Sequence, residues 1–139
     1  MDFLAEYGQA DRRYEKIVTI AGYTLLAAVV LGSIYWLFFR NWQEERRVDQ
    51  FLSLLEQKNY EQAYGLWGCS LERPCPNYSY DKFLEDWGPQ SSLGAVNSYE
   101  VGRSYDQQSG VIILVQINGR RIPNLWVEKD NRVIGFSPY

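Results

Sequence analysis

The residues with the clearest chemical potential in this sequence are its two cysteines, Cys69 and Cys75, which have five residues between them. A disulfide between them would close a short loop containing Pro74 and would stabilise the fold by about 2 kcal/mol. Such bonds persist in oxidising compartments. We predict the disulfide, and with it a domain outside the cytoplasm. Two free thiols in a cytosolic domain are the alternative.

Histidine is absent, and the single methionine is the first residue. Structural zinc needs four nitrogen or sulfur ligands and iron–sulfur clusters need a set of cysteines, so two cysteines are too few. Catalytic sets of the Ser-His-Asp or Cys-His type are also ruled out. We therefore expect no cofactor, no metal site and no catalytic residues. The net charge of -3 gives no reason to expect a nucleic-acid partner.

The first structural element that the sequence predicts covers residues 17–39, an apolar segment of 23 residues without a charge. As a helix it extends roughly 34 Å, enough to cross a hydrocarbon core of about 30 Å. It is too long for a cleaved signal peptide, and no small-residue cleavage site follows it. We predict a short tail over 1–16, a transmembrane helix over 17–39 and an extramembrane domain over 40–139.

The positive charges do not predict which end of this helix lies on the cytoplasmic side, because three basic residues lie near each end. They are Arg12, Arg13 and Lys16 on one side and Arg40, Arg46 and Arg47 on the other. The cysteines decide the prediction instead: a single-pass protein of the inner (cytoplasmic) membrane, with a cytoplasmic N-terminus and a periplasmic C-terminal domain.

Small residues recur along one face of the apolar segment, at Ala21, Thr24, Ala28 and Gly32. Small side chains at this spacing let two helices approach closely, which predicts packing against other membrane helices. Small residues are also common in transmembrane helices and often face lipid, which is the alternative.

Three further helices are predicted by apolar residues at helical spacing. The first covers 42–57. The second follows Asn59, which with Gln62 forms a capping-box pattern. The third follows Ser79 as N-cap and ends at Gly88-Pro89. The last two carry an aromatic stripe that lines a pocket or fills the core: Tyr60, Tyr64, Trp67, Phe83 and Trp87.

From residue 96 the pattern changes to strands, expected over 96–105, 111–117, 121–129 and 132–136. Asn118-Gly119 is a strong hairpin signal, and Pro123 suggests an edge or a bulge. The segment 111–117 is apolar on both faces, as in a strand that is covered on both sides. The predicted fold class is α+β: an N-terminal transmembrane helix, then about three helices packed on an antiparallel sheet of about four strands.

This order resembles the cone-shaped domain shared by nuclear transport factor 2 and ketosteroid isomerase. The likeness covers roughly residues 44–139. It is carried by Phe51-Leu52-x-Leu54-Leu55, by Lys58-Asn59-Tyr60-x-x-Ala63-Tyr64-x-Leu66-Trp67 and by Phe83-Leu84-x-Asp86-Trp87-Gly88. The resemblance implies a curved sheet wrapped around the helices, often a dimer through the outer sheet face, and a pocket inside the cone. The same fold serves enzymes and non-enzymes.

Three functions follow from these features. An isomerase-like enzyme would need a carboxylate base and acidic donors, for which the sequence offers Asp81, Asp86, Tyr60, Tyr64, Tyr99 and Tyr105. A membrane-tethered domain could instead bind a small ligand between the aromatic stripes. We favour a non-catalytic accessory or scaffolding subunit of a membrane protein complex. It would contact integral membrane subunits through the transmembrane helix and the outer sheet face. A respiratory or photosynthetic complex would be a natural host, although no residue points to one.

Overall fold

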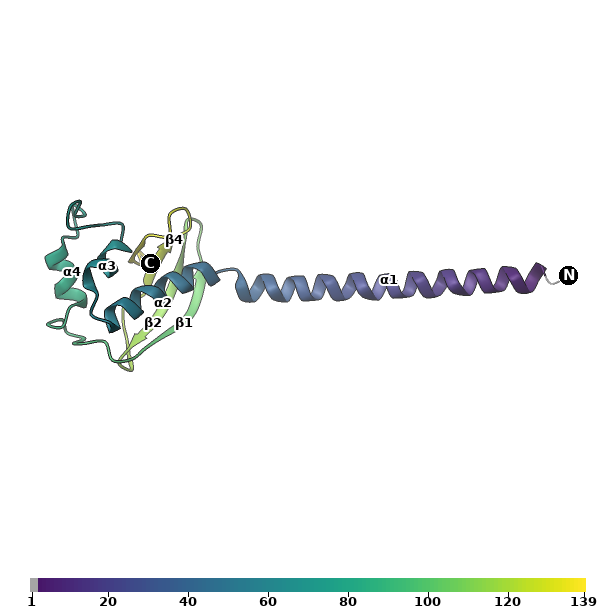
Figure 1. Cartoon of the computed structure of the whole chain (residues 1–139), viewed down its shortest axis with the longest axis horizontal. Coiled ribbons are helices and arrows are strands. Elements are labelled where there is room, and N and C mark those ends of the chain that lie inside the picture. The colour runs from purple at the N-terminus through teal and green to yellow at the C-terminus, as the bar shows by residue number, and fades with distance from the viewer. Residues whose placement is uncertain (1–2) are drawn as a thin grey trace. The chain divides into compact units, whose positions relative to one another are not determined.

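The computed structural model describes residues 3–139, with side chains from residue 11 onward. The chain divides into two compact units, residues 1–40 and 41–139, which we describe separately. The elements, labelled in Figure 1 where there is room, are α1 (Phe3–Phe39), α2 (Trp42–Glu56), α3 (Tyr60–Gly65), α4 (Tyr80–Trp87), β1 (Tyr99–Asp106), β2 (Gly110–Ile117), β3 (Arg120–Arg121), β4 (Leu125–Glu128) and β5 (Ile134–Phe136). This is the α+β class that the sequence predicts.

The first unit is the long helix α1, in which every side chain from residue 11 to residue 40 is exposed. An 18-residue window has a mean hydropathy of 2.1 with none of it buried, so α1 is long and apolar enough to cross a membrane. The helix begins at Phe3. Residues 3–16, predicted as a tail, therefore continue the helix, and Arg, Glu and Lys in this stretch favour that conformation.

The core of the second unit forms around α2, whose buried face carries Val48, Phe51, Leu52 and Leu55. These residues lie three and four positions apart, so they share one side of the helix. This side packs against β1, β2 and β4, and Figure 1 shows α2 crossing the strands. The predicted spacing is confirmed, and α2 is the element that joins helices and sheet.

Helices α3 and α4 are short and complete the helical layer. Ser79 caps α4 by accepting a hydrogen bond from the amide of Lys82, as predicted. Asn59 does stand at the N-cap of α3, but its side chain makes no capping bond, so the predicted capping box is wrong. The chain leaves the helix after Gly65 and turns at Gly68, whose φ is +78°.

The sheet is antiparallel and open, with strands in the order β1-β2-β4-β5 and β3 paired to β2. Residues Asn118 and Gly119 both have positive φ, 52° and 77°, which confirms the predicted two-residue hairpin between β2 and β3. The segment predicted as one strand over 121–129 is interrupted at 122–124, where Pro123 lacks the amide that a ladder needs. The sheet therefore has five strands.

The two faces of β2 differ. Val111, Ile113, Val115 and Ile117 are at most 1% exposed and form the core with the helices. On the opposite face Ile112 is buried, Leu114 is half-buried and Gln116 is exposed. The prediction of a strand covered on both faces is therefore confirmed on this side only at Ile112, because Leu114 is half-buried and Gln116 is exposed.

Candidate functional site

The helix α1 presents the four small residues predicted for helix packing on one face. Ala21, Thr24, Ala28 and Gly32 are all exposed, and Gly32 forms the floor of a notch beside Val29 and Trp36. An added Cβ on Gly32 would meet nothing within 4 Å. The face is therefore open to a neighbouring helix or to lipid, and helix packing there stays a prediction.

Aromatic side chains gather in the last turn of α1, and a basic residue, Arg40, follows directly after it. The rings of Tyr35 and Phe39 stack with their centroids 4.7 Å apart, and the guanidinium of Arg40 lies 5.0 Å from the centre of the Trp36 ring. Such amphipathic rings and snorkelling arginines favour the interface between lipid and water. This end of α1 has the composition of a membrane boundary.

The two cysteines form the predicted disulfide, with their Cα atoms 5.3 Å apart. The Tyr64 hydroxyl lies beside it, where it donates to the carbonyl of Tyr78 at 2.5 Å and accepts from the amide of Cys75 at 3.3 Å. A side chain of α3 thereby holds both ends of the segment from Cys75 to Tyr78. The loop is fastened to the core by a covalent bond and by a buried hydroxyl.

The aromatic stripe lies inside the helical layer. Tyr64 and Phe83 are fully buried, Trp67 and Trp87 nearly so, and Tyr60 packs against them half-buried. Ring centroids are 5.3 Å apart for Tyr64–Phe83 and 6.1 Å apart for Trp67–Trp87. Because these rings contact one another, they fill the core, which is one of the two roles predicted for them.

The residues considered for an isomerase-like site lie on different parts of the domain. Asp81 and Asp86 are exposed on α4, and Asp86 accepts a hydrogen bond of 2.7 Å from Tyr78. Burial and the neighbouring carboxylate together raise the pKa of the Tyr78 phenol far above its usual value. Tyr105 pairs with Ile112 on the face of the sheet away from the helices. The acid Tyr78 was not anticipated, because it falls outside every predicted helix and strand.

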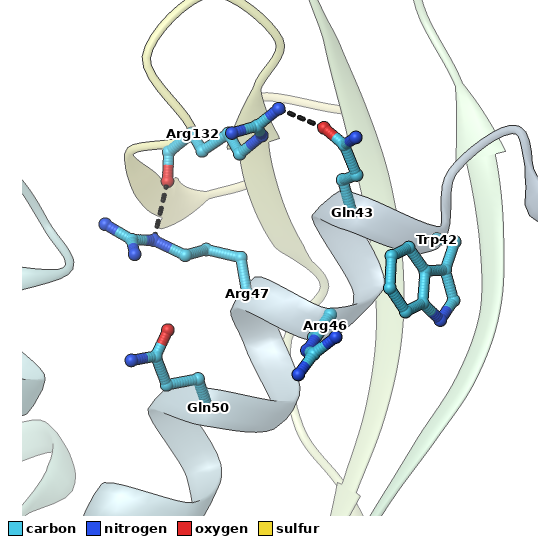
Figure 2. A pocket seen from close by; sticks show the side chains of 6 residues that line it. All are labelled: Trp42, Gln43, Arg46, Arg47, Gln50 and Arg132. Carbon is cyan, nitrogen blue, oxygen red and sulfur yellow. Dashed lines mark hydrogen bonds between the residues drawn. The ribbon is translucent and has the colours of Figure 1, made fainter.

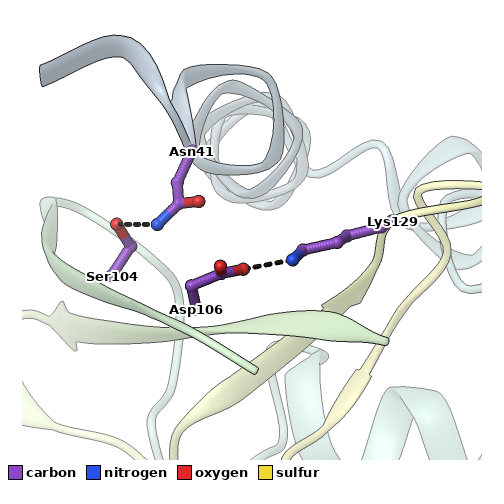
Figure 3. Close-up of polar contacts among 4 residues, drawn as sticks. All are labelled: Asn41, Ser104, Asp106 and Lys129. Carbon is purple, nitrogen blue, oxygen red and sulfur yellow. Dashed lines mark hydrogen bonds and ion pairs between the residues drawn. The ribbon is translucent and has the colours of Figure 1, made fainter. Parts of the chain in front are cut away.

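A polar cluster joins the beginning of α2 to β1 (Figure 3). The Ser104 hydroxyl donates to the Glu45 carboxylate at 2.5 Å and accepts from the Asn41 amide at 3.2 Å. Nearby, Asp106 forms an ion pair with Lys129. Each contact connects residues more than 20 positions apart, so no local sequence pattern predicts it. The two bonds of Ser104 hold the first turn of α2 against β1, and the ion pair joins the end of β1 to the residue that follows β4.

The outer face of the sheet, defined by Tyr105, Ile112, Leu114, Trp126 and Tyr139, is aromatic. Ile112 lies between its strand partners Tyr105 and Trp126, and the ring of Tyr139 lies 6.1 Å from that of Trp126. Tyr105 is 48% exposed. A shallow groove of about 390 Å³ beside it is lined by charged and polar groups that include Glu100, Arg103, Gln116 and Arg121.

Comparison with known proteins adds no relative, since no protein-family model, curated protein or solved structure matches this chain.

Proposed function

We propose that this chain is a non-catalytic accessory subunit that α1 anchors in a membrane and that binds other membrane proteins. One observation carries the proposal: the helices cover one face of the sheet, while the other face exposes aromatic rings. Exposed aromatic patches with a polar rim are typical of protein-binding surfaces. Here Tyr105 lines the groove together with Glu100, Arg103 and Arg121, and Tyr139 is exposed beside the ring of Trp126.

Two further features support the proposal. The small-residue face of α1 would let the helix pack against helices of a partner. The disulfide would be retained in an oxidising compartment, which favours a domain on the extracytoplasmic side of an inner membrane. A curved, cone-like form of the sheet, as in the nuclear transport factor 2 group, is part of the same proposal.

The test is mild detergent extraction of the full chain from its native membrane, followed by native-gel separation. We expect co-migration with other membrane proteins at a fixed ratio. Tyr105→Arg should release the chain from them, because it places a charge on the outer face. The matched control is Leu71→Arg, an apolar residue 54% exposed on the disulfide loop and outside that face.

Two results would contradict the proposal. A chain that migrates alone has no stable partner, and binding of a small ligand by the membrane-tethered domain would then become the better hypothesis. If Tyr105→Arg and Leu71→Arg both leave the complex intact while both variants remain folded, the outer face is not the contact surface.

A further inference from the structure

A second surface of the domain is basic and has no place in the function proposed above. It is a shallow pocket of about 310 Å³ on the solvent side of α2, lined by Trp42, Gln43, Arg46, Arg47, Gln50 and Arg132. Three of these side chains are guanidinium groups and none is a carboxylate. Within residues 11–139 none of the three arginines forms an ion pair. The pocket is therefore positively charged.

The side chains are held in place by one another, as Figure 2 shows. Arg47 donates through Nε to the main-chain oxygen of Arg132 at 3.3 Å, and Arg132 donates to the side-chain oxygen of Gln43. The guanidinium of Arg46 lies 5.1 Å from the centre of the Trp42 ring. Backbone φ at Arg132 is +55°, in the left-handed region that most side chains avoid. The pocket is thus built from both ends of the domain sequence.

The positive charge is local. Residues 41–139 hold ten Lys and Arg against thirteen Asp and Glu, so the domain as a whole is acidic. An acidic domain is repelled by an anionic membrane surface, whereas each arginine close to such a surface contributes about 1 kcal/mol of attraction. No carboxylate lines this pocket, although Asp49 lines the adjoining hollow with Arg46 and Gln50, so the positive charge is confined to the pocket itself.

The covalent chain sets an upper limit to the distance between the end of α1 and the first residue of the pocket. Trp42 is three residues after Phe39, where α1 ends, so the two Cα atoms are at most about 10 Å apart. The headgroup layer on each side of a bilayer is roughly 5–8 Å thick. If α1 crosses the membrane, the first turn of α2 therefore lies in or beside the phosphate layer.

We propose that this pocket binds the phosphate headgroup of an anionic phospholipid in the adjacent leaflet. Guanidinium groups donate in pairs to phosphate oxygens, and tryptophan favours the headgroup level. The proposal rests on α1 as a membrane anchor but not on a protein partner, so it can fail or hold independently of the outer sheet face.

The experiment uses the full chain in neutral detergent micelles, with native mass spectrometry to count retained lipid. The probes are dioleoylphosphatidylglycerol, dioleoylphosphatidylcholine and inorganic phosphate. We expect the anionic lipid to be retained at one molecule per chain and more tightly than the zwitterionic lipid. The double variant Arg46→Gln/Arg47→Gln should weaken that retention on the order of tenfold.

The matched control is Arg120→Gln/Arg121→Gln, which removes two adjacent exposed arginines from β3 and the same charge. It should retain the anionic lipid as the parent chain does. Arg132→Asn is a second test variant, because asparagine adopts the left-handed backbone readily while lacking the guanidinium. It should also weaken retention, and a normal thermal unfolding transition would show that the fold persists.

Several outcomes would overturn the proposal. Equal retention of the two lipids, or equal loss in the pocket variant and the β3 variant, would mean that no specific site exists. Displacement of the lipid by inorganic phosphate at a similar concentration would identify a site for free anions. If the pocket variant keeps the lipid but loses its native protein partners, the arginines bind an acidic protein surface instead.

Discussion

The indole ring of Trp126 lies directly against Gly110, its diagonal neighbour across β2 and β4. A Cβ placed on Gly110 would come within 2.3 Å of the ring and within 2.7 Å of the Val127 carbonyl oxygen. Because Gly110 has no side chain, the Trp126 ring can pack against the backbone on the outer face of the sheet. This contact ties the stability of the domain to the surface that we propose for partner binding.

Gly110→Ala should consequently destabilise the domain by about 1–3 kcal/mol, the usual range for overpacking, since the backbone carbonyl has no room to move. Chemical denaturation of the full chain in detergent would measure it. Gly135→Ala is the control, because an added Cβ there meets nothing within 4 Å. Equal stability of both variants would show that Trp126 does not pack on Gly110.

Replacing the cysteines by Cys69→Ser/Cys75→Ser should lower the free energy of unfolding by about 2 kcal/mol, because the unfolded chain gains the freedom of the opened loop. Denaturation curves with and without reductant would measure the effect. Reductant should shift the parent chain by the same amount and leave the double variant unchanged. A parent chain that is insensitive to complete reduction would contradict a stabilising disulfide.

Tyr64→Phe should lower the free energy of unfolding by about 1–3 kcal/mol. Without the hydroxyl, the Tyr78 carbonyl and the Cys75 amide each lose a partner. Tyr60→Phe, one turn earlier on α3, serves as the control and should change stability by less than about 0.5 kcal/mol. Similar losses in the two variants would mean that the hydroxyl of Tyr64 does not hold the loop.

The domain should lose stability at alkaline pH. The pKa of Tyr78 is raised in the fold, so above its unfolded value of 10.0 the unfolded chain loses a proton that the folded chain retains. The contribution of Tyr78 to the free energy of unfolding is fully present below pH 10. Above pH 10 it declines by up to about 1.4 kcal/mol per pH unit for one proton. Tyr78→Phe should flatten the decline between pH 10 and pH 11 in thermal unfolding experiments. An unchanged slope would contradict the assignment.

The sequence predicted the elements whose signals are local. Apolar spacing indicated α2 and α4, and Asn118-Gly119 indicated the hairpin, whereas Pro123 was expected at an edge or a bulge of one strand and instead marks a break between two. These signals act over a few residues, because backbone preference and side-chain periodicity are set by neighbours in the chain.

What the sequence did not predict depends on contacts between distant segments. Arg132 bonds to Gln43, 89 positions away, and Ser104 bonds to Glu45, 59 positions away. Neither the basic pocket nor the polar cluster is therefore marked by a pattern of neighbouring residues in the sequence. The capping box failed because the side chain of Asn59 makes no bond to its helix. The basic pair Arg46-Arg47 after Trp42 is evident in the sequence. There it entered only the count of basic residues on each side of the transmembrane helix.

The disulfide has a practical consequence for locating the ends of this chain. Both cysteines of the sequence are consumed in it, so the natural protein offers no thiol to a maleimide. A single cysteine introduced before residue 17 or on the exposed surface of the domain would be the one reactive group. Labelling intact cells with a reagent that does not cross membranes would then report directly on which side each unit lies.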